Sequence, residues 1–112
     1  ERAPRPHLSW PHVYAALTTT KGSTEDPLGV GTVVAEAMHG WLSEMEGYEG
    51  LMMLVEVETD TTLVLAFWES EEVAERQRHA RFQFRDRITA TVDVEVQETV
   101  GYEVAFARLK EL

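Results

Sequence analysis

The chain of 112 residues contains no cysteine, which excludes disulfide bonds, thiol nucleophiles and metal sites built on thiolates. It also lacks any apolar run that approaches the roughly 20 residues of a transmembrane helix. No segment has the composition of a secretory leader. At this length we expect a single cytoplasmic domain that can bury a core and has no membrane partner.

Basic side chains are scarce: ten lysines and arginines stand against twenty acidic residues, giving a formal net charge of −10. A field of this sign repels nucleic acid, so we expect no nucleic-acid partner. The basic residues are nonetheless concentrated in one short segment, at Arg76, Arg78, Arg81, Arg85 and Arg87. Two interpretations remain open: a solvated helix face with glutamate partners, or an anion-binding rim.

Residues that would carry metal or hydrolytic chemistry are also few. The four histidines, His7, His12, His39 and His79, show no ligand spacing such as HxxxH. No Ser, His and Asp arrangement suggests a nucleophilic triad, and no paired carboxylates suggest acid–base hydrolysis. The sequence therefore predicts no metal site.

Hydrophobic periodicity divides the chain into an arm and one domain. Residues 1–11 hold three of the four prolines and no periodicity, which predicts an extended N-terminal arm before a domain at 12–112. His12 to Thr20 alternates as a strand. Asp26-Pro27 then predicts the start of a helix that runs to about Glu46. Its apolar stripe is formed by Val30, Val34, Ala37, Met38, Trp41 and Met45.

The second half of the domain predicts two strands, a helix and two further strands. Residues 50–58 and 62–68 read as a hairpin, and the second of these strands is apolar on both faces. Ser70 caps a helix to about Thr89, with Phe82 facing away from its apolar side. Val92 begins a strand that Thr99-Val100-Gly101 interrupts, and Tyr102 to Leu109 forms a last strand. The order βαββαβ plus an extra C-terminal strand predicts a ferredoxin-like α+β sandwich.

The open face of that sheet is expected to be apolar. We expect it to carry Tyr14, Met52, Leu54, Val64, Ala66 and Trp68. Large apolar patches mark interfaces, and a second copy packed sheet to sheet would cover this one. Closed twofold dimers are the commonest oligomers, so we predict a homodimer.

Two segments of the chain resemble the antibiotic biosynthesis monooxygenase (ABM) domain family of the dimeric α/β-barrel superfamily. They are Glu46 to Leu51, with the letters EGYEGL, and the junction Phe67 to Val73, with the letters FWESEEV. The resemblance covers roughly residues 12–109 and implies a dimeric α/β barrel. Family members include cofactor-independent oxygenases of aromatic polyketides or quinols, haem-degrading monooxygenases and proteins without known activity.

The haem-degrading members resemble this chain at Thr19-Thr20-Lys21-Gly22 and Val100-Gly101-Tyr102. They use an Asn in the first strand, a Trp midway along the second helix and a His two to three turns later. The matching positions hold Ala15, Gln77 and Asp86 or Arg87. The resemblance therefore implies that haem is not cleaved, while haem binding through a neutral histidine stays open.

The polyketide-oxidising members bind a phenol through Asn, Trp, Tyr and Arg side chains, and the phenol itself reacts with dioxygen. The resemblance implies a monooxygenase without cofactor, acting on a small aromatic or quinol-like substrate. The alternative is a non-catalytic dimer that binds a small ligand, haem included; a structural dimer without a ligand is a third hypothesis. The catalytic residues stay unassigned. The predicted pocket residues are Gln77, Trp41, Phe84, Arg76, Arg87 and Tyr14.

Gln77 and Trp41 each leave two interpretations open. Gln77 falls in the middle of an otherwise apolar helical face, and a buried amide without partners costs roughly 1–3 kcal/mol. It either reaches water or backbone, or lines a pocket as a polar group. Trp41 lies on the core side of the first helix, where it packs in the core or forms a pocket wall.

Overall fold

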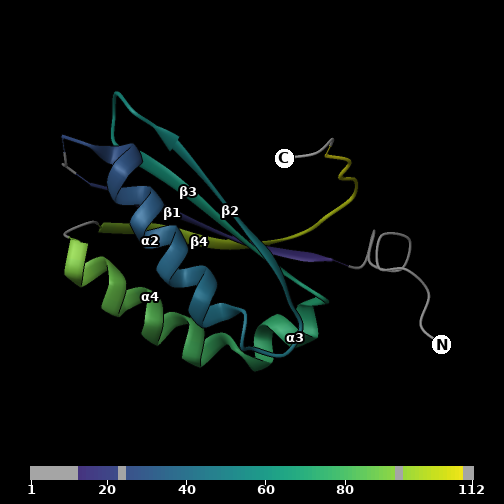
Figure 1. Ribbon diagram of the computed structural model, residues 1–112. Coiled ribbons are helices and arrows are strands. Elements are labelled where there is room, and N and C mark those ends of the chain that lie inside the picture. The colour runs from purple at the N-terminus through teal and green to yellow at the C-terminus, as the bar shows by residue number, and fades with distance from the viewer. Residues whose placement is uncertain (1–12, 23–24, 93–94, 110–112) are drawn as a thin grey trace.

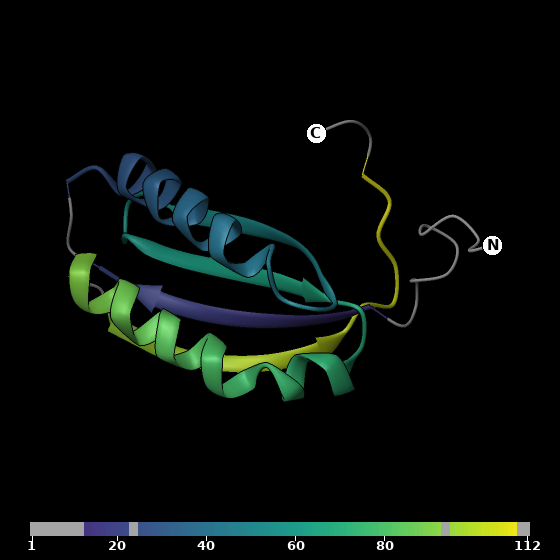
Figure 2. The same ribbon diagram turned by 60° about the horizontal axis from the view of Figure 1, so that its bottom comes forward.

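The computed structural model describes residues 13–22, 25–92 and 95–109. The elements are β1 (Tyr14–Lys21), α2 (Pro27–Leu42), β2 (Tyr48–Glu56), β3 (Thr61–Trp68), α3 (Glu71–Arg76), α4 (Arg78–Val92) and β4 (Glu95–Glu103). The four strands form one antiparallel sheet in the order β2-β3-β1-β4. The helices lie on one face of this sheet (Figure 1, Figure 2). The predicted ferredoxin-like α+β sandwich is confirmed.

The helices begin at the capping residues that the sequence indicates. Asp26 accepts a hydrogen bond from the backbone N–H of Gly29 at 3.2 Å, and Pro27 occupies the first turn of α2. Ser70 accepts a hydrogen bond from the backbone N–H of Val73 at 3.2 Å, which starts α3. These bonds satisfy donors that a helix N-terminus otherwise leaves without partners.

The second predicted helix is interrupted at Gln77. Its backbone has φ −95° and ψ 3°, which separates α3 from α4. Beyond this break, Arg81 and Phe82 line a cavity between the helices and the sheet. The predictions of one continuous helix and of Phe82 facing away from it are therefore wrong.

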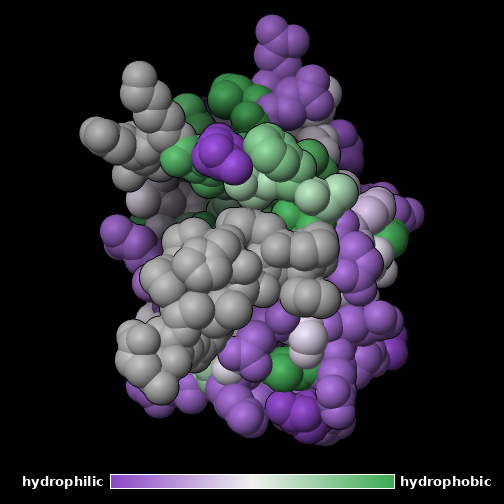
Figure 3. All heavy atoms as spheres, turned by 90° about the vertical axis from the view of Figure 1, so that its right-hand side faces the viewer, coloured by the Kyte–Doolittle hydropathy of each residue, from purple (hydrophilic) through white to green (hydrophobic). Residues whose placement is uncertain are grey.

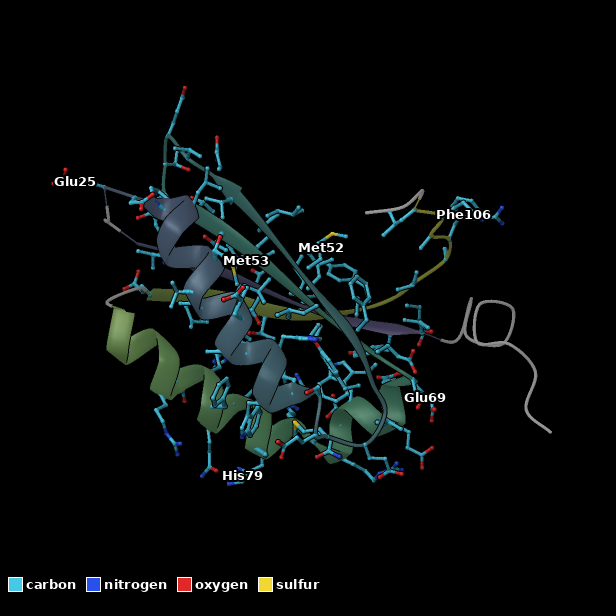
Figure 4. All side chains as sticks on the ribbon, viewed as in Figure 1. Glu25, Met52, Met53, Glu69, His79 and Phe106 are labelled. Atoms are coloured by element: carbon cyan, nitrogen blue, oxygen red, sulfur yellow. The ribbon has the colours of Figure 1, made fainter. Side chains whose placement is uncertain are left out.

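The assignment of the sheet faces also needs correction. Of the six side chains predicted on the open face, Tyr14, Val64, Ala66 and Trp68 instead face the helices. Met52 lies on the open face as predicted, and its neighbour Met53 points toward α2 (Figure 4). By strand alternation and register, the apolar side chains of the open face include Ala15, Leu17, Met52, Leu54, Leu63, Leu65 and Phe67.

The cause of this error is the composition of β3. Its residues from Leu63 to Trp68 are all apolar, so alternation cannot distinguish the two faces. A register shift between Tyr48 and Gly50 in β2 adds to the ambiguity. The open face is nonetheless apolar, and Leu54 on it remains 48% exposed.

The C-terminal part of the domain differs from its prediction. α4 continues to Val92, and β4 is one strand from Glu95 to Glu103 without the predicted interruption. Gly101 marks a close approach in this strand, because a Cβ atom there would collide with the Tyr14 ring. Residues 104–109 form no strand, so the extra strand is absent from the described part of the chain. The predicted arm at 1–11 lies outside the described residues.

The stretch at 104–109 extends away from the sheet (Figure 1). Phe106 on it is 74% exposed and lies far from the helices (Figure 4). Hydrophobic side chains gather in the upper half of the side of the molecule that lies to the right in Figure 1 (Figure 3). No helix in the described part of the chain is long and apolar enough to cross a membrane.

The buried core gathers at the α3 end of the helix layer. It consists of Leu42, Ala66, Trp68, Val73 and Ala74, and Trp68 is completely buried. The Tyr48 ring meets Trp68 edge-on with centroids 5.7 Å apart. The space between α2, α4 and the sheet beyond this core is not filled, and it forms the candidate site.

Candidate functional site

A cavity of about 90 Å³ lies between α2, α4 and the helix-covered face of the sheet. Its walls are mostly apolar, formed by Val30, Val34, Met38, Leu42, Met53, Val64, Ala66, Phe82 and Phe84. The ring of Phe84 on α4 stacks on Trp41 of α2, with centroids 4.3 Å apart and an interplanar angle of 9°. This aromatic pair joins the two helices and holds the apolar wall in place.

The floor of the cavity carries hydroxyl groups. Thr18 and Thr20 of β1 and Thr62 of β3 line it. The hydroxyl of Thr18 is hydrogen-bonded to the hydroxyl of Thr99 at 3.2 Å, and either can be the donor. The floor can therefore donate to, or accept from, an oxygen of a bound molecule.

Arg81 is the most unusual polar group at the cavity. It donates through Nη2 to the carbonyl of Ala74 at 2.9 Å, and its guanidinium lies over the Trp68 ring at 5.4 Å. Its Nε is buried and has no hydrogen-bond partner among the described residues. Burial lowers the pKa of Arg81 from its ordinary value, and the nearby Glu75 opposes this shift. A buried donor without a partner is rare and marks a place where a bound group would be stabilised.

Arg85 stands one helical turn beyond Arg81 and also lines the cavity. Its Nη1 donates to the hydroxyl of Thr99 at 3.1 Å, and its Nε and Nη2 donate to Asp86 at 3.0 and 2.9 Å. Its side chain is only 23% exposed. Arg85 is therefore held in a fixed position and connected to the hydroxyl groups of the floor.

Three guanidiniums of α4 surround the ring of Phe82. Those of Arg78, Arg81 and Arg85 lie 5.1, 5.4 and 4.3 Å from its centroid. The ring face attracts cations, which offsets part of the repulsion between like charges on one side of a helix. The cationic wall of the cavity is thus built around one aromatic side chain.

A second cavity of about 130 Å³ adjoins the first, and the two share Ala16, Arg81 and Phe82. Tyr14 and Glu75 also line it. Burial, followed by the charges of Glu71 and Glu75, raises the pKa of Tyr14 above its ordinary value. Tyr14 therefore stays a neutral hydrogen-bond donor at neutral pH.

Two of the six predicted pocket residues line a cavity: Phe84 the first and Tyr14 the second. Trp41 lies behind Phe84. Gln77 caps the C-terminus of α3, and among the described residues neither cavity includes it. Arg76 is half-exposed and lies 3.7 Å from the carboxylates of both Glu46 and Glu72. Arg87 is exposed.

Arg81 and Arg85 are the site residues that sequence reasoning did not single out. The sequence shows the arginine cluster, and an anion-binding rim is one of the two interpretations that it leaves open. The spacing of Arg81 and Arg85 places them on one side of a helix. The sequence does not select them over Arg76 and Arg87, because that selection depends on how α4 is rotated about its axis after the break at Gln77.

Histidines and acidic clusters contribute little to the site. Among the described residues, no histidine lines either cavity. His39 is exposed and hydrogen-bonded through Nδ1 to the hydroxyl of Tyr48 at 2.8 Å, and His79 points away from the sheet on α4 (Figure 4). Across residues 13–22, 25–92 and 95–109, no group of three or more His, Asp or Glu could hold a metal ion.

No protein-family model matches the chain, and no curated protein matches its sequence. Several solved structures share its fold. A monooxygenase from Streptomyces coelicolor, solved in complex with nanaomycin D, has a TM-score of 0.67 and 14% identity, covering 89% of this chain and 94% of that one. A proposed antibiotic biosynthesis monooxygenase from Deinococcus radiodurans has a TM-score of 0.63 and 12% identity, covering 88% and 98%. A conserved protein from Methanosarcina mazei has a TM-score of 0.60 and 13% identity, covering 86% and 94%. At these identities the likeness establishes the fold.

Proposed function

We propose that this chain, which has the fold of the antibiotic biosynthesis monooxygenase domain family, is a cofactor-independent monooxygenase of a small aromatic or quinol-like substrate. The observation that carries the proposal is the guanidinium of Arg81. It stands at the wall of a mostly apolar cavity, and its buried Nε has no hydrogen-bond partner among the described residues. A negatively charged oxygen of a bound substrate would supply that partner.

The reaction that fits this cavity is the oxidation of a phenol to a quinone by dioxygen. The phenol loses its proton, and the electron-rich ring reduces dioxygen and forms a new carbon–oxygen bond. One oxygen atom stays on the ring as the second carbonyl, and the other leaves in water. The substrate supplies all the electrons, so the net reaction is phenol plus dioxygen giving quinone plus water.

Arg81 and Arg85 would act on the first step. A positive charge beside a phenol favours the phenolate and lowers the pKa of the bound substrate. Arginine remains protonated at neutral pH, so these residues stabilise the oxyanion while the proton passes to water. The stacked rings of Phe84 and Trp41 would hold the aromatic body against α2 and keep water from one side of it.

We also propose a cytoplasmic homodimer in which the open sheet faces pack together. The support for this is the apolar composition of that face, which includes Leu17, Leu65 and Phe67. No described helix lies on this side of the sheet (Figure 2). Sedimentation equilibrium of the wild type and of Leu65→Glu tests the proposal, since a charge at the centre of the face would dissociate a dimer.

The experiment that tests the monooxygenase is oxygen uptake by the purified, metal-free protein with a panel of hydroquinones and naphthols. We expect uptake above autoxidation, with one quinone formed per dioxygen consumed. Arg81→Gln should lower kcat/KM by about 10-fold or more, because it removes a charged hydrogen-bond donor from the wall of the cavity. Arg76→Gln is the matched control, because Arg76 lies on the surface with Glu46 and Glu72.

The alternative is a small-ligand-binding protein without catalysis. Binding of panel members without oxygen uptake above the autoxidation rate would favour this alternative and refute the monooxygenase. Equal losses of activity in Arg81→Gln and Arg76→Gln would refute the role of the cavity. Haem as the ligand is tested by the Soret band, which should not shift on mixing if no histidine reaches the cavity.

A further inference from the structure

The cationic side chains around the cavity are not equally compensated. Arg78 pairs with Glu75 at 3.4 Å, and Arg85 pairs with Asp86 at 2.9 Å. Arg81 donates to a backbone carbonyl at 2.9 Å, and within the described part of the chain it forms no ion pair. Asp60 is the one carboxylate that lines the cavity beside Arg81 and Arg85, and Arg81 is the one of the three arginines around Phe82 that forms no ion pair among the described residues.

The charge of Arg81, which no ion pair offsets among the described residues, is costly where it lies. Arg81 is removed from water by Trp68 and Phe82, over whose rings its guanidinium packs at 5.4 Å in each case. Burial lowers its pKa, Glu75 opposes this, and the like charges of neighbouring arginines lower it further. An anion bound at the cavity would offset both the lost hydration and the repulsion.

Resting on the proposed function, we propose that the substrate is a monoanion, a hydroxylated aromatic carboxylate whose carboxylate pairs with Arg81 and whose hydroxyl lies near Arg85. Arg81 forms no ion pair among the described residues, so it can bind a substrate group that carries a permanent negative charge. Arg85, already paired with Asp86 and bonded to Thr99, suits an oxygen that becomes negative only during the reaction.

The remaining walls offer contacts to the part of such a molecule that enters the cavity. The aromatic body would lie against Phe84, Met38 and Val34, which offer no polar atom other than a thioether. The hydroxyls of Thr18 and Thr99 lie beside Arg85 and can hydrogen-bond to the phenol oxygen. Recognition by charge at one point and by shape elsewhere is typical of small-molecule sites.

The test compares 1-hydroxy-2-naphthoate with 1-hydroxy-2-naphthamide, which differ in charge and hardly in shape. Their dissociation constants are measured by ligand fluorescence without oxygen, so no turnover is needed. We expect the carboxylate to bind about 10-fold more tightly or better, since charge-assisted hydrogen bonds are the stronger ones. In Arg81→Gln the two ligands should bind almost equally, because the affinity for the carboxylate falls while the affinity for the amide stays the same.

Matched variants test whether the charge of Arg81 causes the preference for the carboxylate. Arg76→Gln removes an exposed arginine outside the cavity and should keep the full preference for the carboxylate. Arg81→Lys keeps a cation and should keep part of the preference; it also provides the test if Arg81→Gln does not fold. The preference should persist in 0.5 M NaCl, because salt screens buried pairs much less than exposed ones.

Equal affinity for the two ligands, or a preference that survives in Arg81→Gln, would overturn the inference. The binding of neither ligand would overturn it as well. Carboxylate binding that depends on Arg81 without any oxygen uptake would leave the inference standing and refute the monooxygenase. Oxygen uptake with neutral quinols, together with equal binding of carboxylate and amide, would support the monooxygenase and overturn the inference.

Discussion

The two ends of the helix layer differ in what their side chains do. At the α3 end, Trp68, Val73 and Ala74 are buried at 0%, 5% and 0% exposure and leave no free space around them. At the other end, α2 and α4 are held apart over a cavity by half-buried side chains. Close packing at the α3 end stabilises the fold, whereas the cavity at the other end leaves side chains without full packing contacts.

The cavity end contains a second contrast, between its two helices. α2 carries a single charged residue, Glu36, and presents valine and methionine to the cavity. α4 carries four arginines, of which Arg81 and Arg85 line the cavity. α2 therefore contributes only shape to the site, whereas α4 contributes charge as well, so changes on the two helices should have separable effects.

The largest expected effect is on stability at the α3 end. Trp68→Ala should lower the free energy of unfolding by about 3–5 kcal/mol, because it empties a fully buried site. Phe84→Ala should cost less than about half of this, since its ring is half-buried and already borders free space. Urea unfolding of both variants measures the difference; similar losses would remove the distinction between the two ends.

The second effect concerns shape at α2. Val34→Phe should fill the cavity and weaken binding of the naphthoate and the naphthamide alike, by about 10-fold or more. Val33→Phe is the control on the same helix, because Val33 is 68% exposed and does not line the cavity. Loss of the carboxylate alone in Val34→Phe would contradict the separation of shape from charge.

The third effect is smaller and again contrasts two positions of α2. A Cβ atom at Gly40 would meet nothing within 4 Å, whereas one at Gly31 would lie 3.4 Å from the Met53 sulfur and 3.5 Å from Val55. Gly40→Ala should raise the free energy of unfolding by about 0.5–1 kcal/mol through helix propensity. Gly31→Ala should gain the same propensity but narrow the cavity. Thermal unfolding and ligand binding, measured together, distinguish the two variants. Weaker ligand binding in Gly40→Ala would contradict this prediction.

The smallest effect is on the pH dependence of stability. Burial raises the pKa of Tyr48, which packs on Trp68 at the core end. A raised pKa in the folded state gives stability that is complete below the unfolded value of about 10 and is lost as the pH rises through the folded value. Tyr48→Phe should therefore flatten the fall in unfolding free energy between about pH 9.5 and 11. Parallel pH profiles for wild type and variant would contradict this assignment.

Most of the fold could be predicted because the signals that define it are local. Asp26-Pro27 and Ser70 cap helices by bonds to their own next turn, and strand alternation repeats every two residues. The errors lie where the answer depends on distant residues. The faces of β3 could not be distinguished because Leu63 to Trp68 is apolar throughout, and Gly101 is explained only by the Tyr14 ring that lies on it.

The site was less predictable than the fold for a related reason. The sequence showed an arginine cluster, but only the rotation of α4 determines that Arg81 and Arg85 reach the cavity. Gln77 stands outside the regular helices, between α3 and α4. A pattern read at constant helical periodicity across that residue places Phe84 on the inner face but misses Phe82.

The break at Gln77 also affects how this protein could acquire new substrates. It divides the segment after β3 into a short helix that belongs to the core and a longer one that belongs to the cavity. Residues of 78–92 other than Arg81 can therefore be varied while the packing around Trp68 is kept, because Arg81 is the member of this segment whose guanidinium lies over the Trp68 ring. Libraries confined to this segment should yield folded proteins with altered ligand preference more often than libraries spread over the whole chain.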